Sequence, residues 1–250
     1  MRNSYYFLSD VHLGLENRDK EWKKESLLIE ALRSIREDAK ELFIVGDLFD
    51  YWFEYKRVYQ KGYFRTLSAL HEITSSGIPV HYVIGNHDFM HRDFFEDVLQ
   101  VRMHEDSIER TLDGKDFFIS HGDGLIKDDY LYNILKKILR NKKIQFLYSL
   151  LHPDFGIWFA SGSSKKSRES TVKYEKDPRD KLFDFSKGLI DKGKDYIIMG
   201  HTHKRAYEEY NNGYYINLGT WLKMPCLGRY RDGHFEFIDF SLTTDADTTK

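Results

Sequence analysis

Polar side chains with the chemistry of metal ligands follow five short apolar runs in this sequence. The runs lead into Asp10-Val11-His12, Gly46-Asp47, Gly85-Asn86-His87-Asp88, His121-Gly122-Asp123 and Gly200-His201-Thr202-His203. Each run is rich in β-branched and aromatic residues, which is typical of a buried strand. Open α/β sheets form their sites at the carboxyl ends of strands, so we expect these side chains to converge.

Seven of these side chains form a candidate ligand set of carboxylates, imidazoles and one amide: Asp10, His12, Asp47, Asn86, His121, His201 and His203. Without thiolates, the set suits a borderline divalent ion such as Mn²⁺, Fe²⁺ or Zn²⁺, and Mn²⁺ is our first choice. Seven ligands are too many for one tetrahedral zinc but fit two ions that share a bridging carboxylate. A single His or Asp at a strand end is usually a capping or core residue, yet five matched strand ends argue against that alternative.

Local geometry gives two further expectations. Residues two apart in a strand face the same side, so Asp10 with His12, and His201 with His203, should each point into one pocket. Gly85 should let the chain turn sharply before Asn86.

The elements that must position these residues can be read from hydrophobic periodicity. We expect helices at 21–40 and 63–75, a short helical segment at 94–99, and strands at 5–9, 42–45, 79–84, 115–120, 196–199, 214–217 and 234–240. Turn signals occur at Asp113-Gly114, Asn211-Asn212-Gly213 and Asp232-Gly233. Alternating strands and helices followed by strands with tight turns indicate an α/β core with mixed sheets.

The segment 128–184 breaks this rhythm and reads as helices and loops inserted between two site-bearing strands. We therefore predict a core formed by 1–127 and 185–242, an inserted helical cap at 128–184 that covers the site, and a flexible tail at 243–250.

Composition excludes several classes of protein. With 250 residues, 41% hydrophobic, and a net charge of -2, the chain has no overall attraction to nucleic acid or membrane. The single cysteine, Cys226, excludes an internal disulfide and a cysteine-rich zinc site. We find no signal-peptide pattern and no run near the roughly 18 apolar residues that span a bilayer, so we expect a cytoplasmic protein. The oligomeric state is left open.

The five motifs, in their order and strand context, resemble those of the calcineurin-like metallophosphoesterases over residues 4–240. The resemblance implies a four-layer α/β/β/α sandwich with a two-metal site. It also implies that one ion is held by Asp10, His12 and His203, that the other is held by Asn86, His121 and His201, and that Asp47 bridges them. His87 would lie beside the substrate phosphate as general acid or transition-state stabiliser. Asp50 and Asp88 are candidates to orient the imidazoles, and local turn hydrogen bonding is the alternative for both.

Within that family the chain most resembles the UDP-2,3-diacylglucosamine diphosphatases of lipid A synthesis. The matching segments are 46–52, 86–89, 121–125, the Asp128-Asp129-x-x-Tyr132 stretch and the cap with Ser163-Ser164-Lys165. The resemblance implies hydrolysis of the pyrophosphate bond of a nucleotide-linked glycolipid, which releases UMP and 2,3-diacylglucosamine 1-phosphate. The implied substrate-binding residues are Asn86, His87, Asp129, Ser164, Lys165 and Arg168. The sequence departs at His87, where the best-known branch has Arg.

The stretch 131–160 interleaves large apolar residues with lysine and arginine and contains almost no acid. Such a basic amphipathic segment can lie peripherally on the cytoplasmic face of the inner membrane, or its apolar face can receive acyl chains. The alternative is an ordinary cap helix with a solvated basic face.

Two rival functions are a general or cyclic-nucleotide phosphodiesterase of the same superfamily and a scaffold that has lost catalysis. A nucleic-acid substrate is not expected, because the basic residues lie among apolar ones rather than in a continuous groove.

Overall fold

The computed structural model describes residues 2–126, 130–156 and 180–241. Its α-helices are α1 Arg18–Ser34, α2 Phe64–Ser75, α3 Tyr130–Leu139, α4 Lys142–Ser149 and α6 Lys181–Ile190, with short helical turns η1 Ile35–Glu37, η2 Lys61–Tyr63 and η3 Phe94–Val98. Its strands are β1 Ser4–Leu8, β2 Ala39–Val45, β3 Val80–Val83, β4 Val101–His104, β5 Ser107–Leu112, β6 Lys115–Ser120, β7 Tyr196–Met199, β8 Ala206–Tyr210, β9 Gly213–Asn217, β10 Cys226–Arg231 and β11 His234–Asp239.

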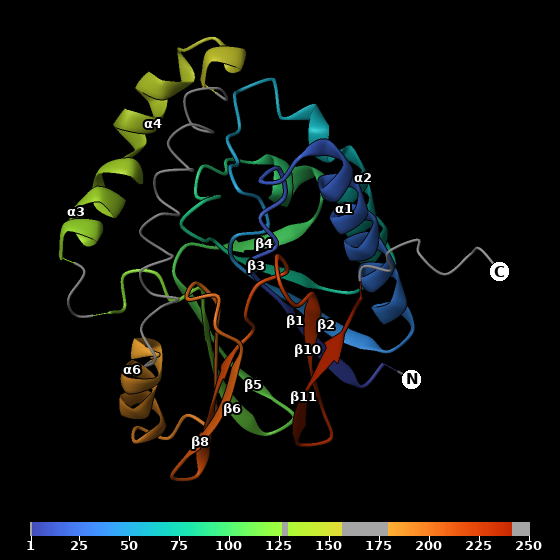
Figure 1. Ribbon diagram of the computed structural model, residues 1–250, viewed down its shortest axis with the longest axis vertical. Helices are drawn as coiled ribbons and strands as arrows, with labels where there is room; N and C mark the ends of the chain where they lie inside the picture. Colours follow the sequence, from blue (N-terminus) through green and yellow to red (C-terminus); the bar gives the residue numbers. More distant parts are fainter. Residues whose placement is uncertain (1, 127–129, 157–179, 242–250) are drawn as a thin grey trace.

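The strands form two mixed sheets with the orders β11-β10-β1-β2-β3-β4 and β5-β6-β7-β9-β8. Strands β1 to β4 are parallel, as are β6, β7 and β9. In Figure 1, α1 and α2 cover the outer side of the first sheet and α6 covers the outer side of the second. The predicted four-layer α/β/β/α sandwich is therefore confirmed.

Alternation along the central strands explains the layers. In β1, Tyr6 and Leu8 pack in the cluster shared with α1 and α2, whereas Tyr5 and Phe7 pack in the cluster between the two sheets. In β7, Ile198 lies in that inter-sheet cluster, and Ile197 and Met199 pack against α6. Both faces of these strands are buried, which is why they read as continuous apolar runs.

The expected helix at 21–40 is wrong at its carboxyl end. Helix α1 begins after the cap residue Asn17, ends at Ser34, and gives way to η1. The Asp38 side chain accepts hydrogen bonds from Ser4 and Tyr6, and Ala39 pairs with Ser4 in the parallel ladder. Residues 39 and 40, whose sequence pattern predicts helix, therefore form the start of β2 because this strand pairs with β1.

Sequence periodicity missed β4, β5, β8 and β10. Three of these, β4, β5 and β8, are edge strands, and β5 and β8 expose charged side chains such as Glu109 and Glu208. Edge strands carry such charges because their outer backbone faces solvent, which removes the apolar signal. The three predicted turns are confirmed as the β5–β6, β8–β9 and β10–β11 hairpins.

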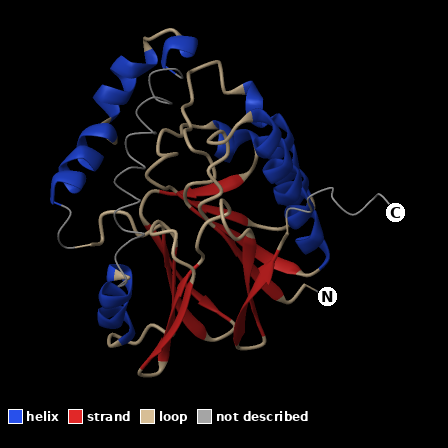
Figure 2. Ribbon diagram, in the orientation of Figure 1, coloured by secondary structure: helices blue, strands red, loops and turns tan. Residues whose placement is uncertain are grey.

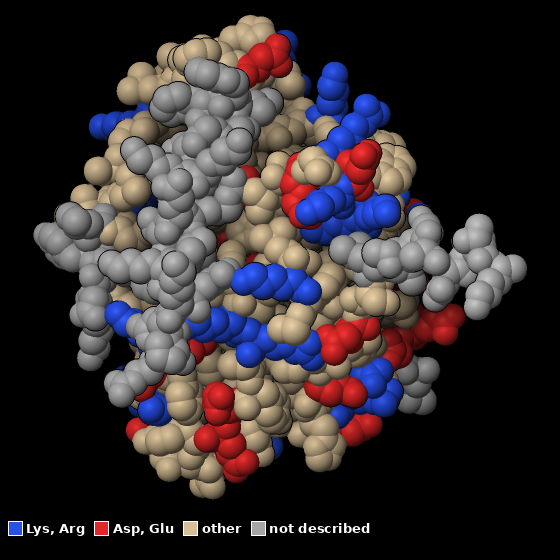
Figure 3. Space-filling view, in the orientation of Figure 1, with Lys and Arg blue, Asp and Glu red and all other residues tan. Residues whose placement is uncertain are grey.

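Helices α3 and α4 lie apart from the layers, above the loops (Figures 1 and 2). Helix α6 runs across the predicted boundary between 184 and 185, and its Leu182 and Ile190 pack on the second sheet. The division into core and cap stays a prediction. Within the part of the chain that the structure describes, no helix combines the length and apolarity needed to cross a membrane. Figure 3 shows acidic and basic side chains mixed over one face.

We predict that His104 makes the fold sensitive to acid. Burial, together with the positive charges of His81, Arg110 and Arg102, lowers the pKa of His104 to about 4. Its Nε2 lies 3.0 Å from His81 Nδ1, and the other nitrogen of His81 lies 3.1 Å from Glu41. Below pH 6.5 the unfolded chain protonates this imidazole while the folded chain does not, so stability should fall as the pH drops from 6.5 to 4.

Replacing His104 with Gln should reduce the loss in the free energy of unfolding between pH 6.5 and pH 4 by on the order of 1 kcal/mol. This value already allows for the partial exposure of the side chain. Urea unfolding at pH 7, 5.5 and 4.5 measures it, with the exposed His234→Gln as control. An unchanged slope in His104→Gln would contradict the assignment.

Candidate metal centre

All seven candidate ligands lie in loops directly beyond strand ends of the two sheets. Figure 2 shows these loops gathered above the ends of both sheets. Asp10 and His12 follow β1, Asp47 follows β2, Asn86 follows β3, His121 follows β6, and His201 and His203 follow β7. The predicted convergence is therefore present.

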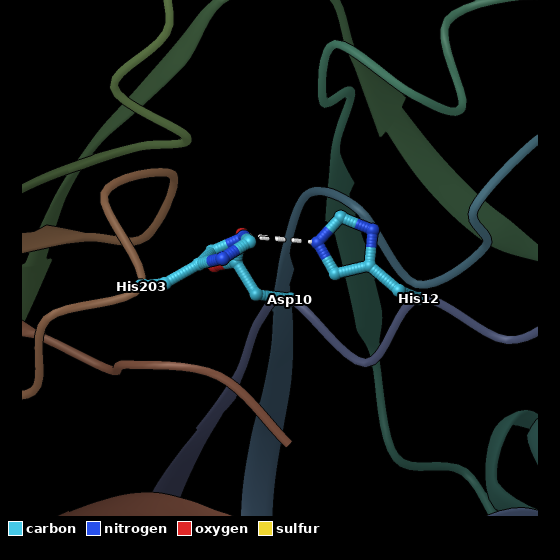
Figure 4. A group of neighbouring side chains, drawn as sticks. All are labelled: Asp10, His12 and His203. Carbon is cyan, nitrogen blue, oxygen red and sulfur yellow. Dashed lines mark hydrogen bonds and ion pairs between the residues drawn. The ribbon is translucent and has the colours of Figure 1, made fainter. Parts of the chain in front are cut away.

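One group consists of Asp10, His12 and His203, drawn in Figure 4. His12 Nε2 lies 3.0 Å from His203 Nε2. Asp10 Oδ1 lies 3.3 Å from His203 Nε2 and 3.7 Å from His12 Nε2. The three ligand atoms thus surround one small volume.

A second group forms around Asn86. Its Oδ1 lies 3.0 Å from His121 Nε2 and 2.9 Å from His201 Nδ1. Asp47 Oδ2 stands between the two groups, 3.2 Å from His121 Nε2 and 3.8 Å from His12 Nε2. The candidate ligands thus form two groups with Asp47 between them; which residues hold which ion stays a prediction.

The buried carboxylates of this centre favour the binding of cations. Asp10, His12, Asp47 and His121 are almost completely buried. Burial alone would raise the pKa of Asp47, but the neighbouring His121 and His87 lower it, so the carboxylate stays ionised. Burial likewise opposes protonation of His121, yet the Asp47 carboxylate raises the pKa of His121 to about 10. Carboxylates that hold a proton so firmly on an imidazole would also attract a divalent ion.

The hydrogen bonds of the imidazoles are also consistent with metal binding. His121 Nδ1 donates to the Val45 carbonyl at 2.9 Å, which leaves Nε2 to face the centre. Burial and the charge of His121 lower the pKa of His201 to about 4, so His201 is neutral and able to ligate. The donor set therefore fits two divalent ions; the roles of the individual ligands, and the choice of Mn²⁺ over Fe²⁺ or Zn²⁺, stay predictions.

The expected strand alternation of these residues is wrong, because β1 ends at Leu8 and β7 at Met199. Five of the seven ligands instead have left-handed backbone, with φ between 49° and 68°: Asp10, His12, Asp47, His201 and His203. This conformation costs roughly 1–2 kcal/mol for a residue with a side chain. Contacts between neighbouring loops hold it, such as His12 N donating to Asp47 O at 3.0 Å.

Gly85 matters for close approach rather than for a special turn. Its φ is not in the left-handed region, but a Cβ there would collide with the Asp47 side chain. A Cβ on Gly46 would likewise collide with the His121 ring. Both glycines let the loops approach closely enough for the ligands to meet.

His87 lies against the first group and is almost fully buried. Its backbone N–H donates to Asp47 Oδ1 at 2.9 Å, and its Nδ1 donates to the Asp50 carbonyl at 3.2 Å. Its ring packs edge-on against His12 with centroids 4.9 Å apart. His87 also groups with His12 and Asp47 within ligand distance of a single ion, which the sequence did not indicate.

Asp50 and Asp88 play different parts. Asp50 Oδ1 lies 3.7 Å from Nδ1 of both His12 and His87, which is beyond hydrogen-bond distance, so its role in orienting the imidazoles stays a prediction. Asp88 instead accepts from Gly85 N at 3.0 Å and from the Tyr82 hydroxyl, so it stabilises the turn. Lys24 was missed by sequence reasoning: its buried ammonium donates to the His12 carbonyl at 2.8 Å.

Helix α3 docks on the centre with its polar side. Lys136 Nζ lies 2.8 Å from Asp123 Oδ2, and the Tyr132 hydroxyl donates to the same carboxylate at 3.1 Å. Arg140, one helical turn further on, donates to the Gly85 carbonyl at 3.3 Å. Tyr132 and Lys136 of α3, and Arg140 directly after the helix, thus contact loops that carry candidate ligands. Four predicted substrate contacts lie outside the described residues: Asp129, Ser164, Lys165 and Arg168.

A family model described as calcineurin-like phosphoesterase matches residues 4–205. The chain belongs to this family. Members act as metal-dependent phosphoesterases, so the chain is a hydrolase of phosphoric esters that uses divalent metal ions.

Three curated relatives share the name UDP-2,3-diacylglucosamine hydrolase. A Porphyromonas gingivalis protein is 36% identical over 174 residues, which cover 69% of this chain and 66% of that protein. A Neisseria meningitidis protein is 29% identical and covers 86% of this chain and 89% of its own length. A Haemophilus influenzae protein is 26% identical over 95% of this chain and 99% of its own length.

We predict that Asp47→Ala and Asn86→Ala each reduce metal binding and turnover while the fold persists. Asp47→Ala should bind fewer than two Mn²⁺ per chain in equilibrium dialysis with elemental analysis. Turnover should fall at least ~100-fold, because replacing even a residue that only hydrogen-bonds to a metal ligand lowers activity or metal affinity roughly 10- to 100-fold. Asp19→Asn, on the exposed start of α1, is the control. Wild-type metal content in Asp47→Ala would refute the bridging role.

Proposed function

We propose that the protein hydrolyses the pyrophosphate bond of UDP-2,3-diacylglucosamine to UMP and 2,3-diacylglucosamine 1-phosphate, a step of lipid A biosynthesis. The observation that carries the proposal is Asp47 Oδ2 between two ligand groups, with His87 beside them. The shared name of relatives that align with up to 95% of this chain supports this substrate over other phosphoesters.

Two bound divalent ions would lower the pKa of a water molecule and neutralise charge on the phosphate oxygens. Asp10, His12 and His203 would hold one ion, Asn86, His121 and His201 the other, and Asp47 both. Mn²⁺ is the ion we propose. The chain itself contributes burial, which excludes bulk water, and a set of donors fixed by loop contacts before the substrate arrives.

His87 is the proposed catalytic residue. The Asp50 carbonyl accepts the Nδ1–H, so Nε2 faces away from it, and in the imidazolium form Nε2–H would supply a hydrogen bond or a proton to a phosphate oxygen. We propose that Asn86, His87, Asp129, Ser164, Lys165 and Arg168 contact the substrate.

We further propose that the protein works peripherally on the cytoplasmic face of the inner membrane, where a glycolipid substrate resides. Support comes from Phe146 and Leu147 of α4 and from Leu150 directly after it, which are 62%, 63% and 68% exposed. In α3, Leu135 and Ile138 are also exposed while Lys136 is bound to Asp123. Lys142 and Lys143 begin the same helix, α4, and would favour anionic lipid.

We predict that the Mn²⁺-loaded protein releases UMP from UDP-2,3-diacylglucosamine with much higher kcat/KM than it cleaves bis(p-nitrophenyl) phosphate. His87→Ala should lower kcat about 100-fold, the lower range for a lost general acid. His71→Ala, an exposed histidine on α2, is the matched control. Equal or better cleavage of the aryl diester would favour a general phosphodiesterase.

For the membrane contact, the double variant Phe146→Ser, Leu147→Ser should lose most binding to vesicles of phosphatidylglycerol and phosphatidylcholine. Two large apolar side chains contribute about 1.5–3 kcal/mol each when fully buried. Cosedimentation measures the bound fraction, and Tyr207→Ser, an exposed aromatic on β8, is the control. Unchanged binding in the double variant would exclude this surface.

A further inference from the structure

The two loops that carry Asp47 and His87 run side by side beyond the metal centre. Phe53 and Met90 form an isolated parallel bridge, and Glu54 N donates to the Met90 carbonyl at 3.1 Å. At the other end of the same pair of loops, His87 hydrogen bonds to Asp47 and Asp50. The loops are therefore joined at both ends.

The distal end is held by a buried carboxylate, that of Glu54, which is only 3% exposed. Its Oε2 accepts three backbone N–H groups, from Arg92 at 2.9 Å, Asp93 at 3.1 Å and Phe94 at 3.2 Å. Its Oε1 accepts the Trp52 indole N–H at 3.1 Å. A buried carboxylate with several charge-assisted hydrogen bonds is a rigid anchor, and its removal leaves those donors unpaired.

His91 strengthens this anchor. Its Nδ1 lies 3.6 Å from Glu54 Oε1, and its ring stacks on Trp52 and meets Phe95 edge-on. The ring thus packs its own segment against Trp52 of the Glu54 loop. His91 lies four residues beyond His87 on the same loop, so a short stretch of chain connects this anchored end to His87.

We propose that Glu54 is a positioning residue for His87: its carboxylate holds the 86–94 loop in register with the 46–54 loop, and turnover depends on that register. Among the described residues, the carboxylate contacts residues 52 and 91–94 rather than the candidate ligands. The inference rests on the proposed role of His87, and it holds for any phosphodiester that the centre cleaves.

A double-mutant cycle on the Mn²⁺-loaded protein tests this, with bis(p-nitrophenyl) phosphate as substrate. Glu54→Ala should lower kcat at least about 10-fold, while KM stays within about twofold. In the His87→Ala background, Glu54→Ala should cost no further factor, because residues that act through one another are not additive. Glu54→Gln, which keeps one acceptor oxygen, should recover part of kcat. Asp97→Asn, an exposed acid on η3, is the control.

A second readout does not need turnover. In metal-free protein labelled with ¹⁵N-histidine, the ring signals of His87 should shift in Glu54→Ala and stay in place in Asp97→Asn. Losses that multiply in the cycle, or an unmoved His87 signal, overturn the proposal. If His87→Ala leaves kcat unchanged, the proposal falls with the role of His87, while UMP release by the wild-type protein would still support the proposed function.

Discussion

The structure depends on one buried negative charge, the carboxylate of Asp47. One of its oxygens faces His121 and His12, and the other accepts the backbone N–H of His87. A carboxylate without water at this depth is tolerable only if cations or hydrogen-bond donors surround it on every side. The ligand loops approach closely because Gly85 has no side chain to keep Asp47 away.

The two-sheet core makes that convergence possible. Parallel strands β1, β2 and β3 end together in one sheet, and β6 and β7 end together in the other. The inter-sheet cluster of aromatic residues, in which Phe7 stacks on Phe43 and Phe117, sets the spacing of the two edges. The left-handed backbone of Asp10, His12 and Asp47 is then imposed by contacts between loops that this spacing brings together.

Much of this centre could be predicted from the sequence, for a physical reason. A buried strand that ends in Asp or His leaves a local signal, and five such signals identified the ligand loops. The backbone conformation could not be predicted in the same way, because αL at His201 or Asp47 results from long-range contacts. Glu54 and Lys24 were missed because each stabilises backbone far away in sequence, at residues 92–94 and at His12. Edge strands such as β8 were missed because their exposed charges conceal the period of two.

The sequence separation of the ligands has a consequence for how the protein is made in the cell. Asp10 Oδ1 and His203 Nε2 lie 3.3 Å apart, yet the two residues are 193 positions apart in the sequence. During synthesis His203 must therefore leave the ribosome before the group that contains Asp10 and His12 can be completed. A ligand that binds only the folded state stabilises that state by mass action. The cations would therefore stabilise the completed fold and would not assist the first steps of folding. A nascent or truncated chain would contain Asp10 and Asp47 but not yet His201 and His203. Metal binding would then stabilise only chains in which these histidines are present and folded.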